Sequence, residues 1–387
     1  MTKSSKHHDR KNILHVVNIY FVIPYFIGGQ FRYFGDKGYK MHVVCSASEY
    51  LDAYARAQGF DYREIPILRS VNIGQDLRSI RAICRYIREK NIGIVVGHTP
   101  KGALLAMIAA RLTGVPIRIY FRHGLVYQTS HGVKHFILKT VDRMTSLLAT
   151  RIVCVSPSVM KNAIADRLAP AHKQIILANG TCSGIDTSGK FNPRNIDSAK
   201  LDAMRRRWGL HDGDWVIGYT GRLVRDKGII ELVRAFRRLH AADSHYRLLL
   251  VGMFEKRDSL PPDVIDAVKS DPAIVWTDFQ NTDMEYFYSM MNVYVLPSYR
   301  EGFPTGVLEA QAMEVPVVTT RATGCIDAIH ENETGLFVGH DDKELAEAIR
   351  SIHDGKTAVD GEKARRWVVE NFDNHIVWKE IEKLYHQ

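Results

Sequence analysis

The sequence predicts an α/β protein built from two doubly wound, Rossmann-like domains that face a cleft. Three observations lead to this prediction: the length, an alternation of short apolar runs with amphipathic patterns, and a polar break near mid-chain. A chain of 387 residues favours two hydrophobic cores over one. With 45% hydrophobic and 25% charged residues, it has the composition of a folded globular protein, which argues against a disordered chain or a disulfide framework.

The first half of the chain predicts a parallel sheet covered by helices on both faces. Short runs rich in Val and Ile, joined by amphipathic segments, are typical of such a sheet. The predicted strands are Ile13–Val17, His42–Cys45, Tyr62–Ile65, Ile94–Gly97, Ile117–Phe121, Ile152–Val155 and Gln174–Leu177. The predicted helices between them are Leu51–Gln58, Asp76–Lys90, Lys101–Leu112 and Ser156–Leu168.

The same pattern restarts after a linker rich in Gly, Ser, Thr and Asn, Ala178–Pro193. The predicted strands beyond it are Trp215–Tyr219, Arg247–Val251, Ile274–Trp276, Val293–Leu296 and Val317–Thr319. The tail Ala364–Tyr385 reads as helix, and its aromatic residues need a surface to cover. We therefore expect domains at 1–186 and 187–370, and a helix at 371–387 that crosses back to pack on the first domain.

The two halves of the chain differ in charge. Residues 1–186 contain 26 Lys and Arg against 11 Asp and Glu, a net charge of +15, whereas residues 187–387 carry a net charge of −6. The overall +9 is therefore an average of two unlike domains, which indicates that the domains meet different partners.

The sequence favours a cytoplasmic protein. Its five cysteines are scattered without C-x-x-C spacing, which predicts neither a disulfide framework nor a zinc site. The apolar stretch 13–27 contains His15, Asn18 and Pro24, so we interpret it as a buried strand running into a helix and not as a signal peptide. No apolar run is long enough to span a membrane.

The most informative motif is Tyr299–Ala310, which follows a predicted strand and opens a helix near Thr305. Glycines in such a loop let backbone N–H groups approach an anion, and the helix N-terminus adds partial positive charge. Glu301 lies in the loop and Glu309 about one turn inside the helix, where carboxylates can accept hydrogen bonds from sugar or ribose hydroxyls.

A second motif, Tyr219–Ile229, also joins a strand end to a helix. Gly221 frees the backbone, Arg222 offers a bidentate fork and Lys227 a point charge, a combination suited to neighbouring phosphates. Two loops suited to anion binding, each following a strand of the same sheet, indicate a binding site for a nucleotide diphosphate. No G-x-x-x-x-G-K-[ST] motif is present, which argues against a P-loop nucleotidase.

Together these motifs resemble the family-4 retaining glycosyltransferases of the GT-B fold, in particular those that build bacterial capsule, O-antigen and exopolysaccharide. The resemblance extends over nearly the whole chain, because Ile94–Leu104 and Gly114–Gly124 look like the acceptor-side domain of that family. It implies transfer of a hexose or N-acetylhexosamine, with retention of the anomeric configuration, from a nucleotide-diphosphate sugar to a lipid-linked saccharide. The resemblance implies UDP as the nucleotide, because this is the usual one in the family. No cofactor and no metal beyond this donor substrate is implied.

The resemblance also implies residue roles. Arg222 and Lys227 would hold the diphosphate, Glu301 would position the transferred sugar, and His123 would reach that sugar from the other domain. His98, at the end of the preceding strand, is a weaker candidate for the acceptor side. The residues expected to bind the donor are Gly221, Gly302, Phe303, Pro304, Thr305 and Glu309.

One feature departs from the family pattern. Many members carry Gly-Gly directly after the first strand, but here Gly28 and Gly29 come about eleven residues after Val17. We interpret them as interrupting the first helix and assign them no role in binding.

The basic first domain suggests a membrane surface. Arg78, Arg81, Arg85 and Arg88 recur at helical spacing, with Leu77, Ile80, Cys84 and Ile87 predicted to face the core. Such a stripe suits a solvated helix face, anionic lipid headgroups or a lipid-linked diphosphate. Lys134, His135, Lys139 and Arg143 could extend it. We therefore expect a peripheral protein on the inner face of the cell membrane.

Two other functions are considered. A nucleotide-sugar epimerase or hydrolase would use the same diphosphate site. A nucleic-acid-binding protein would suit the basic charge, but the sequence lacks aromatic residues interleaved with the basic ones in a known nucleic-acid-binding motif.

Overall fold

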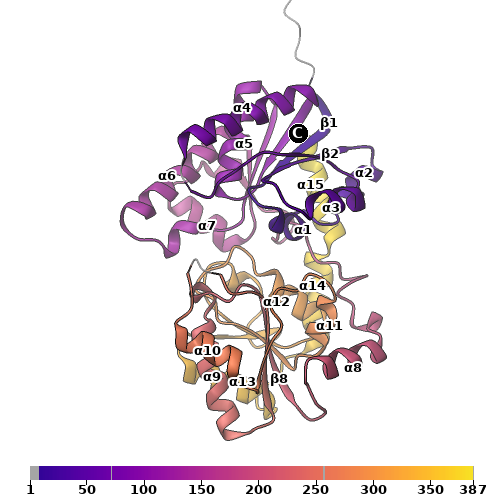
Figure 1. Cartoon of the computed structure of the whole chain (residues 1–387), viewed down its shortest axis with the longest axis vertical. Coiled ribbons are helices and arrows are strands. Elements are labelled where there is room, and N and C mark those ends of the chain that lie inside the picture. Colours follow the sequence, from indigo (N-terminus) through magenta and orange to yellow (C-terminus); the bar gives the residue numbers. More distant parts are fainter. Residues whose placement is uncertain (1–7, 71, 256–257, 387) are drawn as a thin grey trace, which may run out of the picture. The chain divides into compact units, whose positions relative to one another are not determined.

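The computed structural model describes residues 8–70, 72–255 and 258–386 (Figure 1). The chain forms two compact units. One comprises the chain up to Gly184 together with His375 and the residues after it, and the other comprises Ile185–Asn374. Each unit is a parallel sheet with helices packed against it, which confirms the predicted fold class.

The first sheet has the strand order β3-β2-β1-β4-β5-β6-β7, with every neighbouring pair parallel. Its strands are β1 (Asp9–Val16), β2 (Lys40–Cys45), β3 (Asp61–Glu64), β4 (Ile92–Gly97), β5 (Ile117–Arg122), β6 (Arg151–Cys154) and β7 (Gln174–Ile175). All seven were predicted, and their ends differ from the predicted ends by a few residues, as fraying strand ends do. The last five residues of β1 and all residues of β4 are buried, as expected for central strands of a parallel sheet.

The helices of the first unit include one row, α4-α5-α6, packed side by side over the sheet (Figure 1). The helices of this unit are α1 (Ile23–Phe26), α2 (Gln30–Asp36), α3 (Leu51–Gln58), α4 (Ile73–Glu89), α5 (Pro100–Thr113), α6 (Gly132–Leu148), α7 (Pro157–Ala165) and α15 (Asn374–Tyr385). Gly28, with φ +52°, and Gly29 separate α1 from α2, which confirms that they interrupt the first helical segment.

The second sheet has the order β10-β9-β8-β11-β12-β13 and is also fully parallel. Its strands are β8 (Trp215–Thr220), β9 (Tyr246–Val251), β10 (Ile274–Trp276), β11 (Val293–Leu296), β12 (Val317–Thr320) and β13 (Gly335–Val338). Its helices are α8 (Ser198–Arg207), α9 (Ile229–Ala242), α10 (Pro262–Ser270), α11 (Met284–Ser289), α12 (Thr305–Ala312), α13 (Asp342–His353) and α14 (Gly361–Phe372). The edge strand β13 was not predicted.

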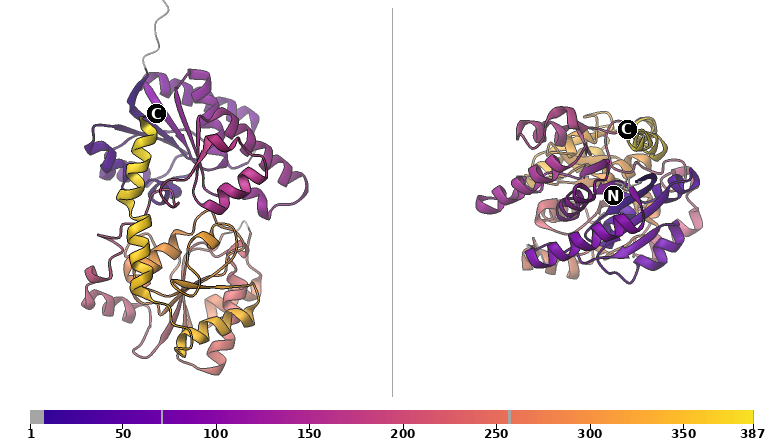
Figure 2. Two further views of the ribbon diagram at one scale, coloured as in Figure 1. Left: turned by 180° about the vertical axis from the view of Figure 1, so that it is seen from behind. Right: turned by 90° about the horizontal axis from the view of Figure 1, so that it is seen from above.

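The C-terminal tail is two helices and not the single helix that the sequence suggested. Asp373 separates α14 from α15 with extended backbone, and residues on either side of it bond to Ile185: the Ile185 N–H donates to Phe372 O and the Asn374 N–H to Ile185 O. Beyond this break α15 packs on the first unit (Figure 2), where Trp378 lies against Tyr33 with ring centroids 5.1 Å apart. This confirms the predicted return of the tail to the first domain.

The helix α4 bears out the basic stripe but corrects one apolar position. Arg78, Arg81, Arg85 and Arg88 are all exposed. Leu77 is 48% exposed and does not face the core, since the buried face is formed by residues further along the helix. The residues buried on α4 are Ser79, Ile83, Cys84, Tyr86 and Ile87.

No helix in the described ranges is long and apolar enough to cross a membrane. All five cysteines are buried free thiols.

Candidate functional site

Both sheets place their candidate residues at the point where the strand order reverses. In the first sheet this point lies between β1 and β4, and in the second between β8 and β11. Helices that leave neighbouring strands in opposite directions open a crevice at such a point, and ligands of doubly wound proteins bind there. The loops after β8 and β11 hold the two predicted motifs of the second unit. His98 and His123 follow β4 and β5 in the first.

The loops after β8 and β11 are in direct contact. Gly228 adopts φ +71° and lies so close to the chain end of β11 that a Cβ atom there would come within 2.1 Å of Pro297 O. Only glycine can occupy this position. The contact is reinforced by Asp226, whose backbone O accepts from the Tyr299 N–H at 2.9 Å and whose carboxylate accepts from Arg300 at 2.9 Å.

This contact brings the predicted catalytic residues of the second unit together. Lys227 forms a largely buried ion pair with Glu301, whereas Arg222, which is about half exposed, forms an ion pair with Glu255. Sequence analysis had assigned Lys227 to phosphate and Glu301 to sugar without pairing them. Arg222 and Lys227 thus each have a carboxylate partner within the protein.

The helices that begin at these loops lack side-chain caps. Neither α9 nor α12 has a side chain that accepts from its first N–H groups. By contrast, α8, α13 and α14 in the same unit are capped by Asp197, Asp341 and Asp360. Uncapped N-termini beside Arg222 and Lys227 offer donors and partial positive charge to an anion.

The carboxylate of Glu309, on the second turn of α12, is held in place by a hydrogen bond from Tyr288. The Tyr288 hydroxyl donates to Glu309 Oε2 at 2.6 Å and lies 2.9 Å from Thr220 Oγ1. Burial raises the pKa of Glu309, and the Tyr288 hydrogen bond and the charge of Lys190 oppose this rise.

Two of the predicted donor-binding residues have buried side chains. Phe303 and Pro304 are buried, and the Phe303 ring packs against Phe372 with centroids 5.3 Å apart. Gly302 is buried as well, while Thr305 is half-buried at the start of α12. Gly221 ends β8 with φ +138°. The apolar residues of the motif Glu-Gly-Phe-Pro therefore anchor the loop, while Glu301 pairs with Lys227.

In the first unit, three histidines form one hydrogen-bonded chain. His15 Nδ1 lies 3.0 Å from His98 Nε2, and His98 Nδ1 lies 2.9 Å from His123 Nε2. Phe26 of α1 stacks face to face on His123, with ring centroids 3.7 Å apart. Burial lowers the pKa of His15 and of His123 to about 3 and that of His98 well below its ordinary value, so all three rings are neutral at physiological pH.

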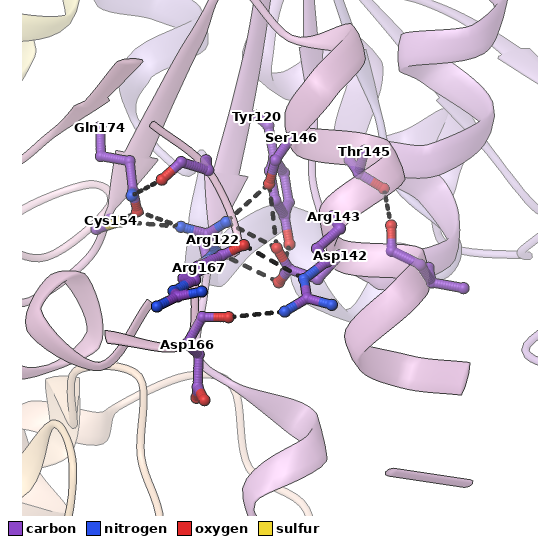
Figure 3. A network of polar contacts seen from close by, with 12 residues as sticks. Tyr120, Arg122, Asp142, Arg143, Thr145, Ser146, Cys154, Asp166, Arg167 and Gln174 are labelled. Atoms are coloured by element: carbon purple, nitrogen blue, oxygen red, sulfur yellow. Dashed lines mark hydrogen bonds and ion pairs between the residues drawn. The ribbon is translucent and has the colours of Figure 1, made fainter. Parts of the chain in front are cut away.

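Directly before His123, the last residue of β5 anchors the strand end. Arg122 is completely buried, yet its guanidinium donates to Asp142 Oδ1 at 2.7 Å, Ser146 Oγ at 2.8 Å and Gln174 Oε1 at 2.6 Å (Figure 3). Burial alone would lower the pKa of Arg122, but the Asp142 carboxylate together with Tyr120 and Cys154 outweighs burial and raises that pKa. The network ties β5 to α6 and β7.

The basic residues of α6 are engaged within the unit. Lys139 pairs with Asp166 at 2.5 Å, and Arg143 donates to the backbone oxygens of Asp166 and Arg167. His135 Nδ1 lies 3.1 Å from Tyr127 O. These three therefore do not extend the basic stripe of α4 as the sequence suggested. Lys134 is exposed.

Several residues at these sites were missed in the sequence. Tyr288 and Glu255 come from segments remote from both motifs, and no local pattern marks them. Phe26 lies two residues before Gly28. The unusual position of the Gly28-Gly29 pair was the only feature of the sequence that drew attention to this segment. His15 was read as an interior strand residue. No group of three or more His, Cys, Asp or Glu side chains gathers as metal ligands would within the described ranges.

Comparison with known proteins provides independent evidence on the family. Residues 30–181 match the family model described as Glycosyltransferase Family 4, and residues 214–354 match Glycosyl transferases group 1. Over 378 residues the chain is 32% identical to the capsular polysaccharide biosynthesis glycosyltransferase CapM of Staphylococcus aureus, covering 97% of both chains. It is 22% identical to the UDP-Gal:alpha-D-GlcNAc-diphosphoundecaprenol alpha-1,3-galactosyltransferase of Escherichia coli, over 92% of this chain and 90% of that protein.

A solved structure shares the fold. The Anabaena protein Alr3699/HepE in complex with UDP-glucose superposes with a TM-score of 0.78 at 18% identity, covering 97% of this chain and all of that one. The likeness confirms the GT-B fold that the motifs predicted.

The Arg122 network predicts a large loss of stability on removal of its acid. Asp142→Ala leaves a buried guanidinium without its counter-ion and should lower the free energy of unfolding by about 3–5 kcal/mol. Urea denaturation followed by circular dichroism measures this change. Asp52→Ala, which removes the partner of Arg56 in an exposed pair, is the control and should have little effect. An equally small effect of Asp142→Ala would show that Arg122 is not held by charge.

Proposed function

This chain belongs to glycosyltransferase family 4, and from that premise we propose that it transfers a hexose or N-acetylhexosamine from a nucleotide-diphosphate sugar to a lipid-linked saccharide, with retention of the anomeric configuration. The observation that carries the proposal is the contact between the loops after β8 and β11, which gathers Arg222, Lys227, Glu301 and Glu309 beside two uncapped helix N-termini.

Charge placement supports the donor part of the proposal. Breaking a sugar–diphosphate bond builds negative charge on the leaving phosphate. Arg222 and Lys227, with the N–H groups of α9 and α12, would stabilise that charge without a metal ion. Glu309 would accept hydrogen bonds from the ribose hydroxyls. The uridine diphosphate named for the Escherichia coli relative and for the Anabaena structure favours UDP as the nucleotide.

We propose that the reaction runs by front-face attack. The bond between the anomeric carbon and the phosphate oxygen breaks, and both electrons go to that oxygen. The acceptor hydroxyl attacks the same face and passes its proton to the departing phosphate, so no covalent glycosyl-enzyme forms. Glu301, paired with Lys227, would position the sugar, and His123 would hydrogen-bond to it.

The relatives favour a surface polysaccharide as the product. The most similar relative named above acts in capsular polysaccharide biosynthesis, and the Escherichia coli protein acts on a diphosphoundecaprenol-linked sugar. A polyprenyl-linked acceptor resides in a membrane, so the enzyme that uses it must work at the bilayer surface. We propose the inner face of the cell membrane as its place of work.

The helix α6 supports membrane binding, because its apolar face points outward. Val133, Phe136, Ile137, Met144 and Leu147 are all exposed, Phe136 and Leu147 by 68% and 67%. Their spacing of 3, 4, 11 and 14 residues places them on one side of the helix. Its buried residues are instead the polar Thr145 and Ser146.

The charge beside this apolar face suits an anionic bilayer. The exposed arginines of α4 lie in the same row of helices, which packs in the order α4-α5-α6, and no ion pair links them to another described residue. An apolar helix face with nearby cations is typical of elements that lie in the interface of an anionic membrane.

A transfer assay tests the central proposal. Purified protein incubated with UDP-sugars and a polyprenyl-diphosphate saccharide should extend the saccharide in an α linkage, which the coupling of the anomeric proton in NMR reports. The rate should be the same with excess chelator. Lys227→Gln should lower kcat/KM about 100-fold or more, since it removes charge stabilisation from the leaving phosphate. Release of free sugar without transfer would instead support a hydrolase.

The Glu309 carboxyl predicts a pH dependence of UDP binding. Only the ionised carboxylate can accept from both ribose hydroxyls, and the raised pKa moves its protonation to higher pH than for an ordinary glutamate. Affinity measured by calorimetry should therefore fall as pH decreases through that pKa, beginning above pH 4.5. Glu309→Gln should bind UDP about 10- to 100-fold more weakly at pH 7.5.

The ratio of wild-type to Glu309→Gln affinity isolates this effect from titration of the UDP phosphate, which both proteins share. That ratio should shrink at low pH. Glu347→Gln, an exposed residue of α13, is the matched control. A ratio that is constant from pH 4.5 to pH 7.5 would contradict the assignment of Glu309 to ribose.

Liposome flotation tests the membrane surface. Replacing Arg78, Arg81, Arg85 and Arg88 by Gln should weaken binding to vesicles containing phosphatidylglycerol by about two to three orders of magnitude, each cation contributing about 1 kcal/mol near an anionic surface. Phe136→Ser with Leu147→Ser should weaken binding at high salt too, because apolar insertion is not screened. Ile326→Ser, an exposed apolar residue of the second unit, is the control. Unchanged binding in both variants would exclude this surface.

A further inference from the structure

Three histidines of the first unit are linked by hydrogen bonds into one chain, although the proposed contact with the donor sugar involves His123 alone. His15 lies within β1, and His98 and His123 directly follow β4 and β5, so the chain crosses the switch point of the sheet. The two links measure 3.0 Å and 2.9 Å, and adjacent rings are nearly parallel, at 18° and 30°. Phe121 also stacks on His98 at 5.1 Å, and these contacts fix each ring plane.

Proton counting leaves two arrangements. Each ring is neutral and therefore carries a single N–H. Either His15 donates to His98 and His98 donates to His123, which places every proton on Nδ1, or all donors reverse and every proton lies on Nε2. In the first arrangement His123 Nδ1 is a donor and His15 Nε2 an acceptor, and in the second these two roles are exchanged.

The buried end of the chain distinguishes them. His15 Nε2 is buried and has no hydrogen-bond partner among the described residues. Its neighbour Phe31 is apolar, with ring centroids 6.0 Å apart. An orphaned buried N–H is rare in folded proteins, so the nitrogen at this end is better left unprotonated. This favours the arrangement with all three protons on Nδ1.

We propose that His15 and His98 are positioning residues that hold His123 as the Nδ1–H tautomer, so that His123 presents an N–H donor to its ligand. Free imidazole side chains prefer the Nε2–H tautomer, in which Nδ1 would be an acceptor. The chain reverses this preference by occupying Nε2 of His123 with the N–H of His98. The stacked Phe26 ring holds the plane in which the Nδ1–H points.

This inference rests on the proposed function only for the identity of the ligand. A donor at His123 Nδ1 suits an acceptor oxygen of the transferred sugar, such as a ring-substituent hydroxyl. The position of the proton is a property of the protein alone and can be measured without substrate.

Long-range ¹H–¹⁵N NMR of protein labelled in histidine nitrogens reads the tautomers directly. Three residues should show the Nδ1–H pattern and should not titrate between pH 5.5 and pH 8. Their assignment follows from the signals lost in His15→Phe, His98→Phe and His123→Gln. His172 is an exposed histidine that takes no part in the hydrogen-bonded trio, so His172→Gln should leave the three Nδ1–H signals unchanged. An Nε2–H pattern for His123 in the wild-type protein would overturn the proposal.

Two variants at position 98 separate positioning from packing. His98→Phe keeps an aromatic ring in the stack but removes both hydrogen bonds, so His123 should change to the Nε2–H tautomer and kcat should fall about tenfold. His98→Asn keeps a donor near the place of Nδ1 and should restore the Nδ1–H pattern at His123 and part of kcat. UDP affinity should be unchanged in both, because UDP alone lacks the sugar.

These readouts separate the two proposals. If the wild-type protein shows the Nδ1–H pattern but no transfer is found, the histidine chain stands and the proposed function fails. If transfer is found and His98→Phe leaves the His123 tautomer unchanged, the histidine chain fails and the function stands. The wild-type spectrum decides the tautomer even if a variant at position 98 does not fold.

Discussion

The buried ion pair between Arg122 and Asp142 is the interaction on which much of the first unit depends. It joins the end of β5 to the middle of α6, with Ser146 and Gln174 completing the hydrogen bonds of the guanidinium. A helix usually attaches to a sheet through an apolar face. The helix α6 attaches through this polar network and through Leu138 and Leu148, which pack against the core, while other apolar side chains of the helix face outward. The same pair fixes the strand end from which His123 extends, so a single charge interaction supports both the proposed membrane surface and the histidine chain.

The second unit uses charge differently. Its two proposed phosphate-binding cations are each paired with a carboxylate of the protein, Arg222 with Glu255 and Lys227 with Glu301. Such pairing avoids leaving Lys227 unpaired in a poorly solvated site. It also means that a diphosphate would bind by exchanging one anionic partner for another, and that Glu301 would be released from Lys227 as the donor arrives. The acidic net charge of this half of the chain is therefore compatible with an anionic ligand, because the cations that matter are local.

Most of the fold could be predicted from the sequence because each buried parallel strand is an apolar run with polar boundaries. The exceptions have physical causes. The edge strand β13 begins with Gly335 and follows the polar residues 331–334, and the break between α14 and α15 coincides with bonds to Ile185, nearly 190 residues away along the chain. Leu77 follows the helical apolar pattern but is exposed. The pattern indicates which side of the helix is apolar, but it does not indicate how far along the helix a packing partner covers that side.

By itself, the sequence determined the two-sheet fold, the family and the loops that carry the candidate chemistry, because strand periodicity and the Glu-Gly-Phe-Pro-Thr-Gly motif are local properties. Only the tertiary structure decided which residues act together. The pairs Lys227–Glu301 and Tyr288–Glu309, the stacking of Phe26 on His123 and the chain from His15 to His123 all join residues that are far apart in sequence. The charge split of the sequence located a basic half, but the fold decided that the four arginines of α4 are exposed while Lys139 and Arg143 of α6 are engaged within the unit. Hydrogen bonds and burial depend on how strands and helices are brought together in space, and no local pattern encodes that.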